Sequence, residues 1–169
     1  MIQTQVCVRA AEAADAEAVR TFLAALSADA QYQRFFTGLG TVSPSLVREL
    51  VAANPRQRNA VAVLGGEVIG HAMAASNADG AVELGVVVAN DHRRRGVATR
   101  LVRTLLEQAA LAGFDRLRMD VLCENRLVLD WIRRDLPDTE FERDGYTLTG
   151  QVSLSRVPVS VPVSRVSAA

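Results

Sequence analysis

One stretch, residues 86–101, constrains the fold of this chain more than any other. It reads VVVANDHRRRGVATRL. The apolar run ends at Ala89, a polar cluster follows, and from Val97 the apolar residues recur at helical spacing. The pattern predicts a buried strand, a glycine-bearing loop and the first turns of a helix. The first N–H groups of a helix lack internal partners and carry partial positive charge, so this junction is expected to bind an anion.

The loop itself carries residues suited to phosphate. Gly96 has no side chain and lets the backbone approach a ligand closely. Arg93, Arg94 and Arg95 supply permanent positive charge, and His92 beside them is placed for phosphate contact. The alternative is a simple turn with a solvated arginine run. Nucleic-acid binding is disfavoured because the formal net charge is zero and no aromatic residue is interleaved with the arginines.

The spacing Arg93-x-x-Gly96-x-Ala98 resembles the Gln/Arg-x-x-Gly-x-Gly/Ala signature of the GNAT N-acetyltransferase superfamily. Ala98 stands where many relatives have a second glycine, which is a mild departure. The resemblance implies a single α/β domain with the GNAT fold, a mixed and mostly antiparallel sheet flanked by helices. It implies an N-acetyltransferase that uses acetyl-CoA as co-substrate and needs no metal. The implied coenzyme A contacts are Val86, Val87, Val88, Arg93, Arg94, Arg95, Gly96, Val97, Ala98 and Thr99.

Glu83 is the candidate general base. It lies on a predicted strand over 81–89 that is otherwise apolar, at the margin of a run expected to be buried on both faces. An amine acceptor arrives as an ammonium ion and must lose a proton before attack, which a carboxylate in such a place can accept, directly or through water. Its ten-residue spacing to Arg93 resembles that of the bacterial Pat-type protein lysine acetyltransferases. The alternative is a solvent-facing glutamate near the start of a strand.

His71 is the rival base, since histidine titrates near neutrality. If Ser76 pairs with Ala81 across a turn, His71 lies opposite Val86, on the face away from Glu83. A half-buried histidine with a satisfied hydrogen bond is therefore expected, unless a β-bulge shifts the register.

The acceptor is the least determined part of the site. The segment Tyr32-x-Arg34-Phe35-Phe36 resembles Pat-type enzymes, which acetylate acyl-CoA synthetases, although this chain shows no regulatory nucleotide-binding domain. The resemblance implies that Tyr32, Arg34, Phe35 and Phe36 bind the acceptor, a protein lysine or a small amine. The alternative is that the rings fill the gap between the first two helices.

Asn125 is predicted to cap a helix over 125–136. The resemblance adds a hydrogen bond to the pantetheine arm of coenzyme A. Seven residues later, many family members carry a tyrosine that protonates the departing thiolate, and here the residue is Ile132. Three alternatives stay open: the thiolate leaves without an acid, another group supplies the proton, or the domain is a non-catalytic acyl-CoA-binding module.

The remaining pattern completes the expected order. Helices are predicted at 15–26 and 43–53, strands at 6–9, 59–64, 68–75 and 116–123, and a hairpin at 141–149. A strand reached through a crossover helix should run parallel to the one before it, so 116–123 should lie parallel to 81–89.

Residues 1–155 are expected to form one domain, and the Val/Pro/Ser-rich residues 156–169 a mobile tail. The chain of 169 residues shows neither a signal peptide nor an apolar run long enough to span a membrane. Cys7 and Cys123 have no metal-ligand spacing and are expected to be buried, reduced thiols. These features favour a cytoplasmic bacterial protein, and homodimerisation stays open.

Overall fold

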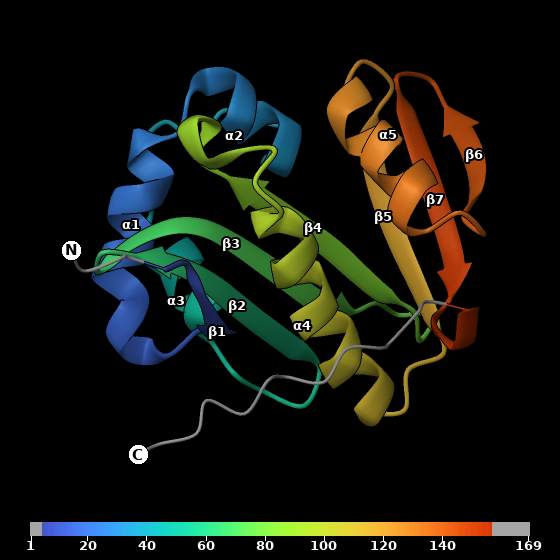
Figure 1. Cartoon of the computed structure of the whole chain (residues 1–169), viewed down its shortest axis with the longest axis horizontal. Helices are drawn as coiled ribbons and strands as arrows, with labels where there is room; N and C mark the ends of the chain where they lie inside the picture. The colour runs from blue at the N-terminus through green and yellow to red at the C-terminus, as the bar shows by residue number, and fades with distance from the viewer. Residues whose placement is uncertain (1–4, 157–169) are drawn as a thin grey trace.

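A seven-stranded sheet in the order β1-β2-β3-β4-β5-β7-β6 organises the computed structural model, which describes residues 5–156 (Figure 1). The strands are β1 (Cys7–Ala10), β2 (Gln57–Leu64), β3 (Glu67–Ser76), β4 (Val82–Val88), β5 (Arg116–Leu122), β6 (Glu140–Asp144) and β7 (Thr147–Ser153). Neighbouring strands are antiparallel except β4 and β5, which are parallel. The predicted mixed, mostly antiparallel sheet is confirmed.

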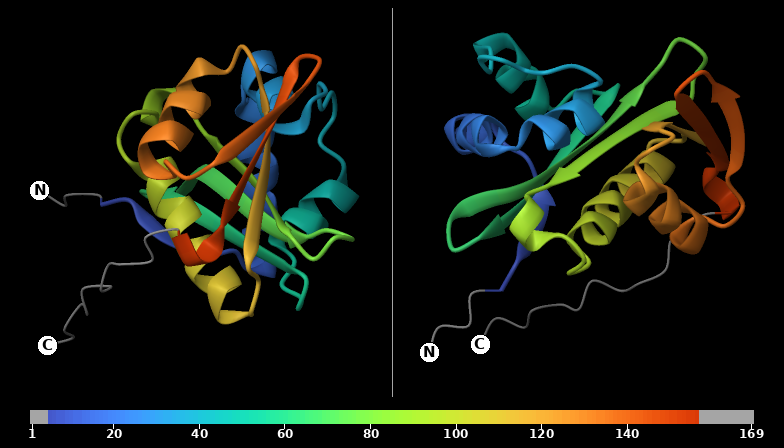
Figure 2. Two further views of the ribbon diagram at one scale, coloured as in Figure 1. Left: turned by 90° about the vertical axis from the view of Figure 1, so that its right-hand side faces the viewer. Right: turned by 90° about the horizontal axis from the view of Figure 1, so that it is seen from above.

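Five α-helices cover the two faces of this sheet (Figure 2). On one face lie α1 (Ala16–Ala25), α2 (Ala28–Phe35) and α3 (Pro44–Val51), and on the other α4 (Val97–Leu111) and α5 (Arg126–Asp135). The 3-10 turns are Ala13–Asp15, Asn90–His92 and Leu154–Arg156. The predicted apolar stripe of α4 is confirmed, because Val97, Leu101, Leu105 and Ala109 are all buried. The apolar spacing predicts no element at 28–35, where α2 forms.

The hydrophobic core has two parts, one on each face of the sheet. Leu101 and Leu105 of α4 pack with Ile132 of α5 against one face. Leu23 of α1 and Leu50 of α3 pack against the other. Strand β4 contributes to both cores, which is why its sequence is nearly continuously apolar.

Strands β4 and β5 pair over only two positions, Val82 with Leu117 and Glu83 with Arg118. Beyond them the strands diverge, as Figure 1 shows. Strand β3 pairs with the other edge of β4 along its whole length. The edge of β4 that faces β5 therefore has no ladder partner over 84–88 among the described residues, and its backbone groups are free for a ligand.

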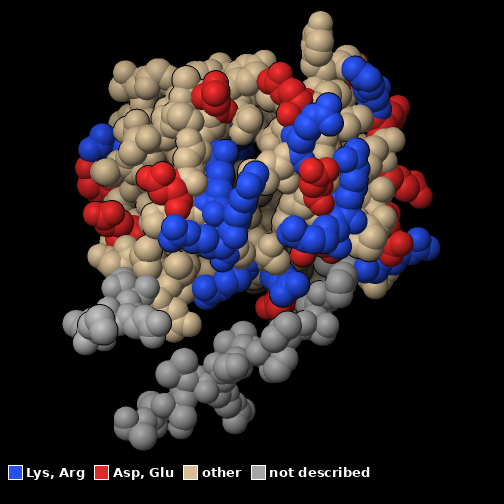
Figure 3. Space-filling model, turned by 45° about the horizontal axis from the view of Figure 1, so that its top comes forward, with Lys and Arg blue, Asp and Glu red and all other residues tan. Residues whose placement is uncertain are grey.

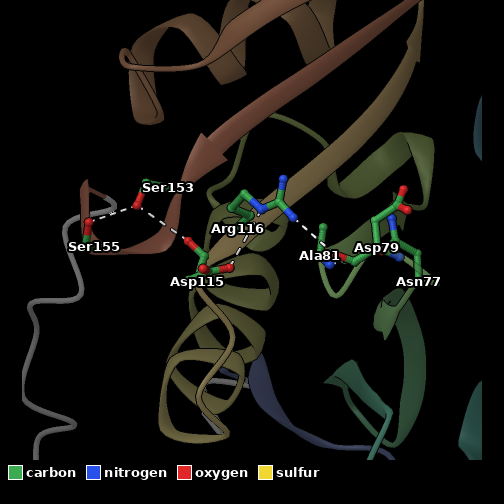
Figure 4. Close-up of polar contacts among 7 residues, drawn as sticks. All are labelled: Asn77, Asp79, Ala81, Asp115, Arg116, Ser153 and Ser155. Atoms are coloured by element: carbon green, nitrogen blue, oxygen red, sulfur yellow. Dashed lines mark hydrogen bonds and ion pairs between the residues drawn. The ribbon is translucent and has the colours of Figure 1, made fainter.

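The opposite end of this strand pair is held closed (Figure 4). Arg116 at the start of β5 donates from Nη2 to the carbonyl oxygen of Asp79, at 3.0 Å. Ser153 at the end of β7 donates from Oγ to the carbonyl oxygen of Asp115, at 3.4 Å. These contacts link the turn before β4 to β5, and the residue before β5 to β7, so the gap opens at one end only.

The predicted register between β3 and β4 is wrong by one residue. Ser76 pairs with Val82 rather than with Ala81. The reason is the side chain of Asn77, whose Oδ1 accepts from the amides of Asp79 and Ala81, both at 3.0 Å. This Asx-type loop takes up one more residue than a simple turn would.

The shift changes the face on which His71 lies. His71 pairs with Val87 and so shares the face of Glu83, not the opposite one. It is nevertheless completely buried, and its Nε2 lies 2.8 Å from the carbonyl oxygen of Leu50. Burial lowers its pKa to about 4, and the nearby Arg34 charge acts in the same direction. His71 is therefore neutral at pH 7 and closed off from solvent.

One further expectation, on the cysteines, needs correction. Cys7 is exposed and Cys123 is half-buried, so the expected burial is wrong, although both are free thiols. Arg156 ends a 3-10 turn, and the rest of the expected tail, 157–169, lies outside the described residues. In the described part of the chain, the helices are too short or too polar to cross a membrane.

Candidate functional site

A cleft of about 820 Å³ occupies the space where β4 and β5 part. Its walls come from these two strands, α2, the first turn of α4, and α5. Figure 3 shows basic side chains gathered beside a hollow on this face. The predicted site residues that line the cleft are Arg34, Phe35, Phe36, Glu83, Val86, Val87, Val88, Arg93, Arg94, Gly96, Val97, Ala98, Thr99 and Asn125. The structure thus brings residues 34–36 of the α2 segment into the same cleft as residues 83–99, although the two segments lie far apart in the sequence.

The backbone conformation at position 96 favours glycine. Gly96 has a φ of 75°, in the left-handed region, and its carbonyl oxygen accepts the first helical hydrogen bond, from Arg100. No side chain caps this end of α4. The N–H groups of Val97, Ala98 and Thr99 therefore lie at the cleft without intrahelical partners, which is the geometry of an anion site.

The three arginines of the loop have different contacts and different positions relative to the cleft. Arg93 donates from Nε to the carbonyl oxygen of Val88, at 3.2 Å, and so holds the loop to the end of β4. Arg94 has a left-handed backbone, with a φ of 59°, and lines the cleft with Arg93. Arg95 is exposed and does not line it.

Glu83 lines the cleft, at the end opposite to the loop along β4. Its side chain is exposed, so the expectation of a dry margin is wrong. The reason is its place beside the turn before β4, where Asn77 donates from Nδ2 to Glu83 Oε1 at 3.3 Å. Because the turn already holds Asn77 through its Oδ1, this bond orients the carboxylate.

The aromatic segment forms α2 and the turn after it. Ser27 caps the helix by accepting from the amide of Ala30, and the helix ends at Phe36 with a φ of 58°. Phe35 and Phe36 line the cleft, whereas Tyr32 is 47% exposed and does not line it. Of the four predicted acceptor residues, Tyr32 alone lies outside the cleft.

Helix α5 contributes one predicted residue and one that sequence reasoning missed. Asn125 caps the helix as predicted, with Oδ1 accepting from the amide of Val128 at 3.3 Å. Ile132 is completely buried. Trp131 lines the cleft and donates from Nε1 to Thr99 Oγ1 at 2.9 Å, which joins α5 to the first turn of α4. No local pattern signals a contact between two helices so far apart in sequence.

Within residues 5–156, no cluster of three or more His, Cys, Asp or Glu side chains could hold a metal ion.

Residues 28–135 match the family model of the acetyltransferase (GNAT) family. The fold is similar to that of the GNAT domain of S. lividans PAT, with a TM-score of 0.79 and 22% identity over 86% of this chain and 89% of that one. A ribosomal-protein-alanine N-acetyltransferase from Brucella melitensis gives 0.70 and 19%, over 87% and 99%. A spermidine N-acetyltransferase from Vibrio cholerae, in complex with CoA and spermine, gives 0.68 and 17%, over 90% and 98%. No curated protein matches the chain in sequence.

The matched residues run from α2 to the end of α5 and include the loop, the free edge of β4 and Asn125. The family model and the parted strands with their anion loop lead to one conclusion: the chain belongs to the GNAT acetyltransferase family and is an acyl-CoA-dependent N-acetyltransferase.

Proposed function

We propose that this enzyme transfers an acetyl group from acetyl-CoA directly to the ε-amine of a protein lysine, with Glu83 as general base. One observation carries the proposal: a single cleft is lined by the anion loop, by the carboxylate of Glu83 and by the rings of Phe35 and Phe36. The two free thiols, Cys7 and Cys123, fit a reducing compartment such as the bacterial cytoplasm as the place of action.

The loop and the free strand edge would hold the co-substrate. The pyrophosphate would lie on the N–H groups of residues 96–99, with charge added by Arg93, Arg94 and Arg95. The pantetheine arm would pair with the free backbone edge of Val86–Val88, with Asn125 as a further contact. A backbone N–H near Val86 would then polarise the thioester carbonyl.

The chemistry needs no covalent enzyme intermediate. Glu83 takes a proton from the substrate ammonium ion, directly or through water, and an exposed carboxylate is open to both routes. The free amine attacks the thioester carbon, the new C–N bond forms, the nitrogen loses its second proton to water and the C–S bond breaks. At position 132 the buried isoleucine has no proton to donate, so coenzyme A leaves as a thiolate, which its low basicity permits.

The aromatic side chains on and just after α2 support a protein acceptor. Phe36 lines the cleft and is 38% exposed, and Tyr32 lies exposed on the same helix. Large exposed rings at the mouth of a site suit contact with another protein surface. The fold similarity to the GNAT domain of S. lividans PAT fits the same acceptor class. The spermidine acetyltransferase of similar fold makes a small amine the second candidate.

Release of the coenzyme A thiol tests the proposal. The purified protein is incubated with acetyl-CoA and either an acyl-CoA synthetase or a panel of small amines. We expect release with the synthetase and acetylation of one of its lysines. Release with an amine alone would contradict the protein acceptor, and binding of acetyl-CoA without release in any reaction would contradict transfer to either acceptor class.

The loop predicts the effect of one substitution on binding. Changing Gly96 to valine forces a β-branched residue into the left-handed region, and the bound loop must keep that strain. We expect the Kd for acetyl-CoA, measured by calorimetry, to rise about 10-fold. Gly80→Val is a matched control, because Gly80 has the same φ of 75° but lies outside the cleft. An equal rise in both variants would contradict the anion-loop assignment.

Loss of the hydrogen bond between Trp131 and Thr99 is expected to weaken acetyl-CoA binding by a smaller factor. Trp131→Phe keeps an aromatic ring but removes the donor to Thr99 Oγ1, and a neutral hydrogen bond contributes about 1 kcal/mol. We expect the Kd for acetyl-CoA to rise about 5-fold. Thr99→Val removes the other partner, so the double variant should be no weaker than the weaker single one. Additive effects would show that the two side chains act separately.

A further inference from the structure

One half-buried arginine of the cleft, Arg34, has two buried guanidinium nitrogens without an acceptor among residues 5–156. Nε and Nη2 of Arg34 are shut off from solvent and have no hydrogen-bond partner among residues 5–156. Burial lowers the pKa of this guanidinium to about 10, so it is still protonated at neutral pH. A buried, unsatisfied charge destabilises the folded protein, so such a group is expected to have an anionic partner in the working state of the protein.

The fold makes room for this guanidinium at one position of β4. A Cβ at Gly85 would lie 2.4 Å from Cζ of Arg34 and 2.6 Å from each Nη, so the group lies flat over the glycine. Its other neighbour is the ring of Phe35, whose centroid is 4.7 Å from Cζ. Glycine in the middle of a strand weakens it and marks a close approach. Here it admits a cation that forms no ion pair within residues 5–156.

The nearest candidates within the chain do not satisfy Arg34. The charge of Glu49 on α3 favours its protonated form, but the two side chains form no ion pair within 4 Å. Glu83, two residues before Gly85 on the same face, bonds to Asn77 instead. His71 is neutral and uses Nε2 for Leu50.

We propose that Arg34, held on Gly85 inside the cleft, is a subsite for a carboxylate carried by the substrate. A guanidinium presents a planar fork of donors that matches a carboxylate. The carboxylate has two possible sources: the far end of a dicarboxylic acyl group on coenzyme A, or the acceptor, as an acid next to the amine. The proposal rests on the proposed function only in taking this cleft as the substrate site.

Calorimetry tests the subsite without requiring turnover, so its failure and that of the acetyl-transfer proposal are distinguishable. In the acyl arm, succinyl-CoA is compared with valeryl-CoA, its neutral counterpart of similar length. In the acceptor arm, with coenzyme A bound, lysine is compared with cadaverine, and a lysine peptide bearing a neighbouring glutamate with one bearing glutamine. We expect the carboxylate to tighten binding about 10-fold in one arm, which identifies the source.

Two variants test whether the preference for a carboxylate depends on Arg34. Arg34→Gln removes the charge, and Gly85→Ala keeps it but displaces the guanidinium, the far end of a flexible side chain, without moving the backbone. Both should abolish the preference, and Gly85→Ala keeps the test valid if Arg34→Gln does not fold, which thermal melting reports. A wild type that prefers no carboxylate in either arm, or a preference that survives a folded variant, would overturn the proposal.

Discussion

Replacing Glu83 with glutamine is expected to lower kcat for acetyl transfer about 100-fold, the usual effect of losing a general base. Glutamine keeps the size of the side chain and a carbonyl oxygen for the bond from Asn77 Nδ2, but it cannot take a proton from the ammonium ion. The Kd for acetyl-CoA should stay within about 2-fold, because the coenzyme site lies at the other end of the cleft. Stopped assays of thiol release and calorimetry measure the two quantities.

Glu67→Gln is the matched control for this experiment. Glu67 is also an exposed glutamate at the start of a strand, β3, but it does not line the cleft. Its variant should turn over at the wild-type rate. Wild-type turnover in Glu83→Gln would remove this carboxylate from the mechanism, whereas an equal loss in both variants would point to a general effect of surface charge.

Acidification is expected to destabilise the protein through His71. Its pKa is lowered to about 4 by burial, with an opposing contribution from its bond to Leu50 and a further lowering from Arg34. An unfolded histidine has a pKa of about 6.5, so between these values the unfolded state binds more protons. Stability from this group is therefore complete above pH 6.5 and is lost as the pH falls towards 4. The loss between pH 7.5 and 4.5 should be about 2–3 kcal/mol.

Urea unfolding at several pH values measures this loss. The chain has two histidines, and His92→Gln serves as the control, since His92 lies in the loop rather than in the core. His71→Gln should flatten the dependence between pH 6.5 and 4.5, whereas His92→Gln should keep the wild-type slope. A wild-type slope in His71→Gln would assign the acid sensitivity to carboxylates.

Much of the framework of the site could be predicted from local sequence. The helical stripe that begins at Val97, the glycine at its N-terminus and the cap at Asn125 all have the predicted structure. The parallel relation of β4 and β5 followed from the crossover helix. These features depend on neighbours within a few residues, so periodicity and capping chemistry suffice to determine them.

The burial and the strand face of His71 and Glu83, the two candidate bases, could not be predicted from local sequence. The side chain of Asn77 lengthened the turn before β4 and moved the register by one residue, which placed His71 on the face of Glu83. A one-residue slip moves every side chain of a strand to the other face, so a small local uncertainty reverses the conclusion. His71 is buried and Glu83 is exposed because different elements cover the two ends of the sheet.

The sequence by itself determined the loop, the helix behind it and the succession of strands along the chain, because short-range spacing encodes them. Only the tertiary structure decided what meets across the cleft. Arg34 reaches Gly85, and Trp131 reaches Thr99, from elements distant in the chain. A hydrogen bond or a close packing contact depends on positions within a few tenths of an ångström, and those are fixed by how the layers pack together rather than by the residues nearby in sequence.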